Sequence, residues 1–357
     1  MIVHRHARTL PVLLLVLLLV LLPTVTHSTA IAASIEVENA TIDLAASITD
    51  AVRTRLAQRP AGLMEGTRFR IISAAAQPGW ALVSVVALDD PQLDPHAPDA
   101  GGLSTLVLVQ QQRDGSWQAA IDGEAAFADM LVITPAELLA ADAQALLAAD
   151  PALRSAHQAA STRISTMEPA STVNYKFPWP AGHAWGWWQG WHMNAQDLGT
   201  TSADRRVLAA ADGVVSGVYA CTLSTMVDLK HADGAVFRYI HLDKQSVDTS
   251  KIRVGARVPQ GLVLGTVKPN TWSDGNCGYT QQSPNSAHIH WVMPTDRPVT
   301  LDGWTITFPT SAWRKDGMTK VPGFGAASTL LSTNVATTSA VPAASNLRHR
   351  VFLPVSR

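Results

Sequence analysis

Residues 226–241 read MVDLKHADGAVFRYIH, and this stretch decides the fold of the second half of the chain. Two runs of strand character flank Asp233 and Gly234, a pair that favours a tight turn between antiparallel strands. Short runs of the same kind recur on both sides, at 207–210, 213–219, 263–267 and 289–293. The sequence therefore predicts that this half is mainly β and is built on an antiparallel sheet.

Composition limits the class of protein. The chain has 357 residues, enough for one large or two ordinary domains. Hydrophobic residues make up 47% and charged residues 15%, which is too apolar for a disordered chain. Lys and Arg number 27 against 28 Asp and Glu, so no positive field favours a phosphate backbone. We expect a folded monomer that does not bind nucleic acid.

The first residues have the features of a secretory leader. Arg5 and Arg8 precede an apolar run at 12–22, and the small-residue triplet Ala-Ile-Ala follows at 30–32. This order predicts a signal peptide at 1–32. The alternative is an uncleaved membrane anchor, but the run is shorter than the about 18 apolar residues that a spanning helix needs. No later segment approaches that length, so we expect an extracytoplasmic protein that is secreted or associated with the cell envelope.

The region 33–155 is predicted to be a small α+β domain without catalytic residues. Apolar residues recur every four positions at Leu44, Ile48, Val52 and Leu56, which predicts an amphipathic helix between Ile35 and about Leu56. Strands are expected at 69–73, 80–88 and 103–110 and after Trp117, and a second helix from Thr134 to about Ala149.

Composition also separates the remaining parts of the chain. Residues 156–173 are rich in Ser, Thr and Ala and are interpreted as a linker. The β-rich domain is expected at 174–325, and a low-complexity tail at 326–357.

The chain contains two cysteines, Cys221 and Cys277. An even number in an exported protein predicts one disulfide between them. A metal site using both thiols is the alternative, but it lacks a C-x-x-C spacing.

Histidines in the β-rich domain form a distinctive series. His288 and His290 are two apart in a predicted strand, so both side chains project from one face, about 6 to 7 Å apart. His192 and Asp197 offer an imidazole and a carboxylate that could both reach a zinc ion. His241 ends the predicted hairpin. Each element alone is more typical of an ordinary surface or core residue, and only their combination indicates a site.

In combination these segments resemble the lysostaphin-type, LytM-like zinc endopeptidases, with the beta-lytic branch as a possible relative. That family cuts peptide bonds in bacterial cell walls. The resemblance covers roughly residues 174–310, and the segments that carry it are 191–192, 197–199, 212–215, 239–242 and 288–291.

The resemblance implies an antiparallel β scaffold, zinc ligands at His192, Asp197 and His290, and catalytic roles for His241 and His288. Two neutral imidazoles and one carboxylate leave the fourth zinc position for water, as in catalytic zinc sites. Zinc lowers the pKa of that water to about 7 and polarises the scissile carbonyl. The implied activity is hydrolysis of peptidoglycan, whose peptide stems or cross-bridges would be the binding partner.

Some features depart from the family or leave alternatives open. Four residues separate His192 from Asp197 where the family commonly has three, so His183 is a second candidate ligand. Five tryptophans lie between 179 and 191 and could either line a substrate site or pack against the sheet. A catalytically silent, peptidoglycan-binding or regulatory protein is the main alternative function. A biotinyl-like carrier is disfavoured because no suitable Met-Lys turn is present.

Overall fold

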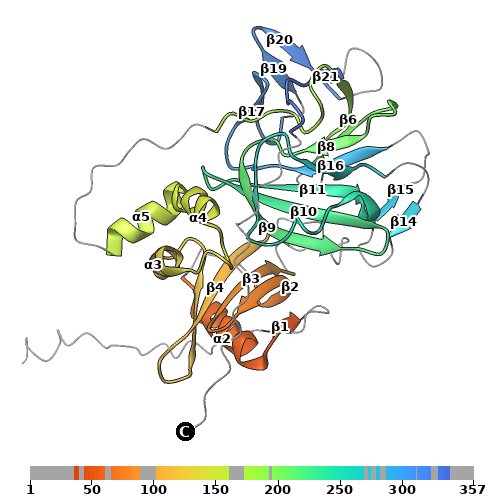
Figure 1. The fold of residues 1–357 in the computed structure, drawn as a ribbon. Helices are drawn as coiled ribbons and strands as arrows, with labels where there is room; N and C mark the ends of the chain where they lie inside the picture. The colour runs from red at the N-terminus through yellow and green to blue at the C-terminus, as the bar shows by residue number, and fades with distance from the viewer. Residues whose placement is uncertain are drawn as a thin grey trace, which may run out of the picture. The chain divides into compact units, whose positions relative to one another are not determined.

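Strands dominate the protein in a computed structural model (Figure 1). The structure describes residues 36–39, 44–60, 66–88, 102–160, 173–192, 195–268, 272–274, 279–281, 287–310, 312–322 and 329–337. The predicted signal peptide, Cys277 and the last twenty residues lie outside this part. None of the helices within the described ranges is long and apolar enough to span a membrane.

The described strands of the N-terminal region form a five-stranded sheet in chain order: β1 (Glu36–Asn39), β2 (Arg68–Gln77), β3 (Trp80–Ala87), β4 (Thr105–Gln111) and β5 (Trp117–Ile121). Helix α2 (Ala46–Ala57) packs on one face, against Val83 and Val107. Side chains that project from the other face of the sheet, such as Leu82 and Leu108, pack against α3 (Ala125–Ile133) and α4 (Ala141–Ala148). Helix α5 (Pro151–Ala160) follows.

The predicted strands of this region are present, but both helix predictions need correction. The first helix begins at Ala46 rather than near Ile35, because strand β1 precedes it. The second predicted helix is divided. Thr134 follows the last residue of α3, where its hydroxyl donates to the carbonyl of Met130, so it ends one helix instead of starting another. A turn at Pro135 then separates α3 from α4.

Among the described residues of the second region, eight strands form one antiparallel sheet in the order β12-β9-β10-β11-β16-β7-β6-β21. Their bounds are β6 (Ala184–His192), β7 (Ala195–Gly199), β9 (Gly213–Ala220), β10 (Ser224–His231), β11 (Val236–Asp243), β12 (Arg257–Val258), β16 (His288–Val292) and β21 (Thr329–Leu331). The predicted hairpin is confirmed as β10 and β11, with Gly234 at a φ of 82° in the turn.

Smaller sheets complete this region. They consist of β8 (Arg206–Leu208) with β13 (Val263–Thr266), β14 (Trp272–Asp274) with β15 (Tyr279–Gln281), and the series β17 (Val299–Leu301), β18 (Trp304–Ile306), β19 (Trp313–Lys315) and β20 (Met318–Lys320). The fold class predicted for the chain, mainly β with an α+β region first, is confirmed.

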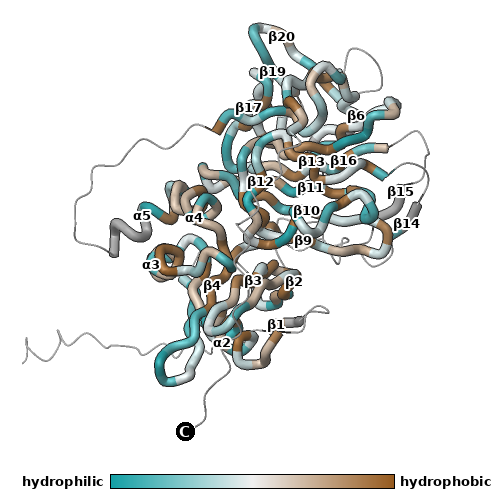
Figure 2. Tube along the Cα trace, in the orientation of Figure 1, coloured by the Kyte–Doolittle hydropathy of each residue, from teal (hydrophilic) through white to brown (hydrophobic). Residues whose placement is uncertain are grey.

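One face of the eight-stranded sheet is covered by the main hydrophobic core. Alternate side chains along the strands, including Val227, Tyr239 and Trp291, are fully buried there. Hydrophobic residues along β11, β13 and β16 are visible in Figure 2. Trp179, Trp185 and Trp187 belong to the same core, so at least three of the clustered tryptophans pack the fold, as one of the two interpretations predicted.

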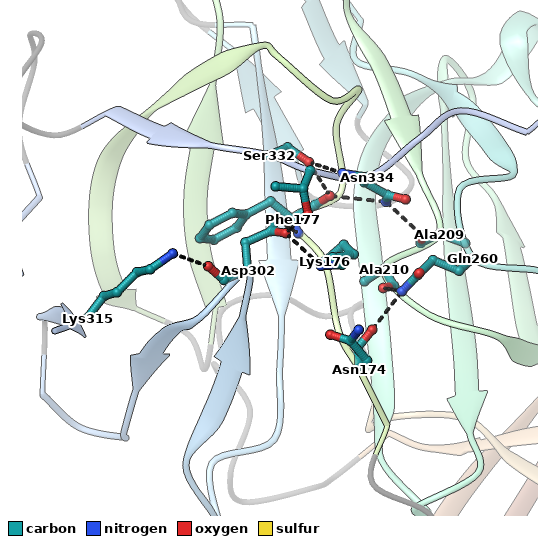
Figure 3. A network of polar contacts seen from close by, with 11 residues as sticks. Asn174, Lys176, Phe177, Ala209, Ala210, Gln260, Asp302, Lys315, Ser332 and Asn334 are labelled. Atoms are coloured by element: carbon teal, nitrogen blue, oxygen red, sulfur yellow. Dashed lines mark hydrogen bonds and ion pairs between the residues drawn. The ribbon is translucent and has the colours of Figure 1, made fainter.

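The segment 329–337 is part of the sheet region, although the sequence places it in a tail. Strand β21 pairs with β6. The amide nitrogen of Asn334 donates to the carbonyls of Phe177 at 3.1 Å and Ala209 at 3.0 Å (Figure 3). These bonds join three distant parts of the chain, because a buried carbonyl needs a donor wherever no strand neighbour supplies one.

Candidate functional site

Three adjacent strands, β11, β16 and β7, bring most of the predicted site residues together. His290 lies directly opposite Asp197 of β7 and Ile240 of β11. Residues opposite each other in antiparallel strands project from the same face, and so do residues two apart along one strand. Asp197, His288 and His290 therefore lie on one side of the sheet, the side opposite the main core. We call this side the site face.

The carboxylate of Asp197 lies between the two imidazoles of β16. Its Oδ1 is 2.9 Å from Nδ1 of His290, and its Oδ2 is 3.6 Å from Nε2 of His288. The side chains are 13% exposed for Asp197, 15% for His288 and 6% for His290. A carboxylate in this position can accept hydrogen bonds from ring N–H groups and so orient the rings.

His241 joins the other three side chains from strand β11. Its ring centroid is 5.0 Å from that of His288, nearly perpendicular to it, and 5.9 Å from that of His290. Asp197, His241, His288 and His290 are called the histidine–aspartate cluster below. It brings together four of the five residues that the resemblance implicates.

A local irregularity directs His241 to the site face. Tyr239 and Leu242 both belong to the main core, and Ile240 lies on the site face, so regular alternation would turn His241 toward the core. The pairing with β10 shifts at this point, where Tyr239 faces Val227 and Leu242 faces Thr225. Two residues of β11 thus oppose one of β10, which is a β-bulge, and bulges of this kind re-aim side chains beside functional sites.

The bulge places the backbone of His241 in an unfavourable conformation. Its φ is 70°, in the left-handed region, which non-glycine residues rarely adopt. The backbone N–H of Lys268 donates to the carbonyl of His241, and Leu242 forms an isolated bridge with Val267. Contacts from this second segment hold the unusual conformation in place. The bulge depends on pairing with β10 and on contacts from Val267 and Lys268, so residues 239–242 carry no local signal that predicts it.

Two further histidines, His192 on β6 and His183 just before it, are candidate zinc ligands. His192 is the last residue of β6 and pairs with Ala195, two residues before Asp197, but its side chain lies outside the described part. His183, the second candidate, lies beside Asp204, with Nε2 3.6 Å from its carboxylate and 39% of the side chain exposed.

The donor set of the cluster fits zinc in part. Imidazole and carboxylate are typical zinc ligands, and two donors on one tetrahedral zinc lie about 3.3 Å apart, close to the 2.9 Å between Asp197 and His290. Among the side chains that the structure describes, no group of three is arranged as a metal site. The family resemblance implies His192 as the third protein ligand, with His183 as the second candidate.

His231 is a core residue rather than a member of the cluster. Its ring packs against Tyr175 and Phe237, and its Nδ1 lies 2.8 Å from the carbonyl oxygen of Asp212. Burial lowers its pKa to about 4. We therefore assign it a structural role.

The long loop before β16 is anchored to the sheet by a buried aspartate. Asp274 accepts hydrogen bonds from the backbone N–H groups of Thr222, Leu223 and Ser224. Cys221 precedes this turn and is 1% exposed. The position of Cys277 is outside the described residues, so the disulfide stays a prediction.

Comparison with known proteins agrees with the family resemblance. Residues 192–300 match the family described as Peptidase family M23, which confirms the LytM-like resemblance for this segment. A solved structure from Pseudomonas aeruginosa, described provisionally as a peptidase M23, is 17% identical, with a TM-score of 0.23 over 62% of this chain and 77% of that chain. No curated protein matches significantly. The matched segment contains the whole cluster and supports a peptidase.

Proposed function

We propose that the chain is a zinc-dependent endopeptidase that hydrolyses peptide bonds in bacterial peptidoglycan. The observation that carries the proposal is the histidine–aspartate cluster, in which one carboxylate and three imidazoles from three strands meet on one face of the sheet. The cluster lies within the segment that matches Peptidase family M23, and this match supports peptide hydrolysis as its reaction.

Zinc would be held by Asp197, His290 and His192. A bound zinc supplies an activated water and polarises the carbonyl of the scissile bond. Asp197 and His290 have the residue types and the proximity for this role, and His192 is the nearest further imidazole along β6.

His241 and His288 are left to handle protons and substrate. Nε2 of His288 lies 3.6 Å from the carboxylate of Asp197, and an imidazole beside the metal site can act as the general acid that donates a proton to the leaving amine. The ring of His241 lies beside that of His288 and nearly perpendicular to it, and it can hydrogen-bond the carbonyl oxygen as negative charge develops there.

Digestion of purified peptidoglycan tests the proposal. We expect the full mature chain to release peptide fragments, to lose this activity with a chelator, and to regain it when zinc is added back. Mass analysis of fragments from defined muropeptides would identify the bond. A protein that binds the wall but releases no fragments at any zinc concentration is instead the silent binding or regulatory protein.

We also propose that the chain is exported and that Cys221 pairs with Cys277. Export would place the protein with its substrate, and the pair would join the β9–β10 turn to the loop already held by Asp274. Mass analysis of peptides from the protein recovered outside the cytoplasm, without reduction, tests both statements.

A further inference from the structure

The N-terminal region packs on the site face itself. Residues 34–357 form one compact unit, and β2, β3, β4 and α4 all contact β9. We call residues 36–160 the module. Because the main core covers the opposite face of the sheet, the module and the histidine–aspartate cluster share the same side.

The apolar part of this contact lies directly beside the cluster. Ala195, Ile240 and Val292 of the sheet pack with Val86 of the module. The partly buried Leu88 and Leu103 pack against the same group. Val292 is two residues after His290, Ala195 is two residues before Asp197, and Ile240 is opposite His290. Two residues along a strand span about 6 to 7 Å, so the module borders the cluster.

A buried ion pair of the sheet lies in the neighbouring part of the contact, and both of its members hydrogen-bond to the module. The guanidinium of Arg238 binds Asp228 at 2.7 and 2.8 Å, and both side chains are at most 1% exposed. The module completes the pair, since Arg238 also donates to the carbonyl of Gly102, and Asp228 accepts from the backbone N–H of Ser104.

A second buried charge has both of its partners in the module. The ammonium group of Lys230 lies 2.5 Å from Asp122 and 2.7 Å from Asp150. Burial alone would lower the pKa of Lys230, but the two carboxylates outweigh it and raise the pKa. Residues of the module therefore supply both counter-charges of Lys230 and cover the Arg238 pair, so the polar groups of this part of the site face have their partners in the docked arrangement.

We propose that the module is a permanent wall of the peptidase site: it stays docked on the site face during hydrolysis, and Leu88 and Leu103 contact the substrate on one side of the scissile bond. This inference rests on the proposed function. It identifies the module as part of the catalytic unit rather than a removable cover, and it predicts that apolar residues are preferred on that side of the substrate.

A cross-link between the module and the sheet tests the docking. The hydroxyls of Ser104 and Ser216 are 2.9 Å apart, so the double variant Ser104→Cys with Ser216→Cys places two thiols at the contact. We expect the oxidised protein to keep kcat within about threefold of its reduced form, because no opening is needed. Loss of activity on oxidation with recovery on reduction would overturn the proposal. The single variant Ser104→Cys, treated identically, controls for effects on the predicted native disulfide.

A substitution in the wall tests its contact with substrate. We expect Leu103→Gln to raise KM for peptidoglycan peptides about three- to tenfold with kcat nearly unchanged. Val132→Gln is the matched control, since Val132 belongs to the same module and is 80% exposed on α3. An unchanged KM for Leu103→Gln would refute the proposal that the module contacts the substrate through Leu103.

Hydrogen exchange separates this inference from the proposed function. The backbone N–H of Ser104 bonds across the contact to Asp228, so its exchange reports opening of the module without requiring activity. We expect it to be as protected as the N–H of Tyr239 in the sheet core, with and without peptidoglycan fragments. Much faster exchange at Ser104 would show that the module opens. Absence of hydrolysis by the wild-type protein would instead refute the proposed function.

Discussion

The Nδ1 atom of His290 lies 2.9 Å from Oδ1 of Asp197, its directly opposed neighbour on the adjacent strand. The pair is fixed by the register of β7 and β16, so both side chains reach the same point in space without help from a loop. Sites built on strands are more precise than sites built on loops.

Loss of either member of this pair should remove zinc. We expect Asp197→Asn and His290→Ala to weaken zinc binding by more than the about 100-fold typical of losing an outer-shell partner, and to abolish hydrolysis. Metal analysis after dialysis measures the first effect. His183→Ala is the control, because His183 lies beside Asp204. If His183→Ala loses zinc while His192→Ala retains it, the ligand on the β6 side is His183.

The two remaining imidazoles should affect the rate but not the metal. We expect His288→Ala to reduce kcat by about 10²- to 10⁴-fold while zinc content stays at the wild-type value. Steady-state kinetics on a defined muropeptide, paired with metal analysis, checks both. A parallel loss of zinc would make His288 a ligand.

The left-handed backbone at His241 gives a stability prediction that is independent of activity. His241→Asn and His241→Val both remove the imidazole, but Asn tolerates a φ of 70° and Val does not. We expect the Val variant to be less stable than the Asn variant by about 1 to 3 kcal/mol in urea unfolding. Equal stabilities would show that the bulge relaxes without cost.

His231 should make stability depend on pH. Its pKa is lowered to about 4 by burial, whereas the unfolded chain has a pKa near 6.5. Above pH 6.5 the ring is neutral in both states. As the pH falls from 6.5 to 4, only the unfolded state takes up the proton, so the free energy of unfolding decreases by about 3 kcal/mol in total.

Urea titrations at several pH values, compared with His231→Gln, isolate this contribution. The Gln side chain does not titrate and can still donate to the carbonyl of Asp212. We expect the variant to lose less stability over this range. The same slope in both proteins would contradict the assignment.

The buried pair beneath the module should respond strongly to single changes. We expect Arg238→Ala to destabilise the protein by about 3 to 5 kcal/mol, because Asp228 is left charged and buried. The double variant Arg238→Met with Asp228→Leu should recover part of this loss. Arg206→Ala breaks an exposed pair with Asp204 and should change the free energy of unfolding by less than about 1 kcal/mol.

Much of the sheet could be predicted from the sequence because hairpins and strand alternation are local signals. The turn at Asp233 and Gly234 and the shared face of His288 and His290 follow from residues that are close together in the chain. The position of His241 could not be derived in this way. Tyr239 and His241 are two apart and would share a face in a regular strand, and only the bulge separates them.

The contact between the eight-stranded sheet and the module also could not be predicted from the sequence. Asp228 and Lys230 alternate with Val227 and Leu229, which is typical of a strand with one solvent-exposed face. In the structure that face is covered: the backbone N–H of Ser104 donates to Asp228, and the carboxylate of Asp122 neutralises Lys230. A pattern within one strand cannot distinguish water from a second layer of protein.

Strand β21 pairs with β6, although it follows β6 by well over a hundred residues. During vectorial synthesis or translocation, β6 therefore emerges long before its neighbour exists, with one row of backbone groups and Trp185 unprotected. Contacts of such wide sequence separation slow folding and leave sheet edges open to aggregation. The peptidase region can complete its sheet only after residues 329–331 have been synthesised.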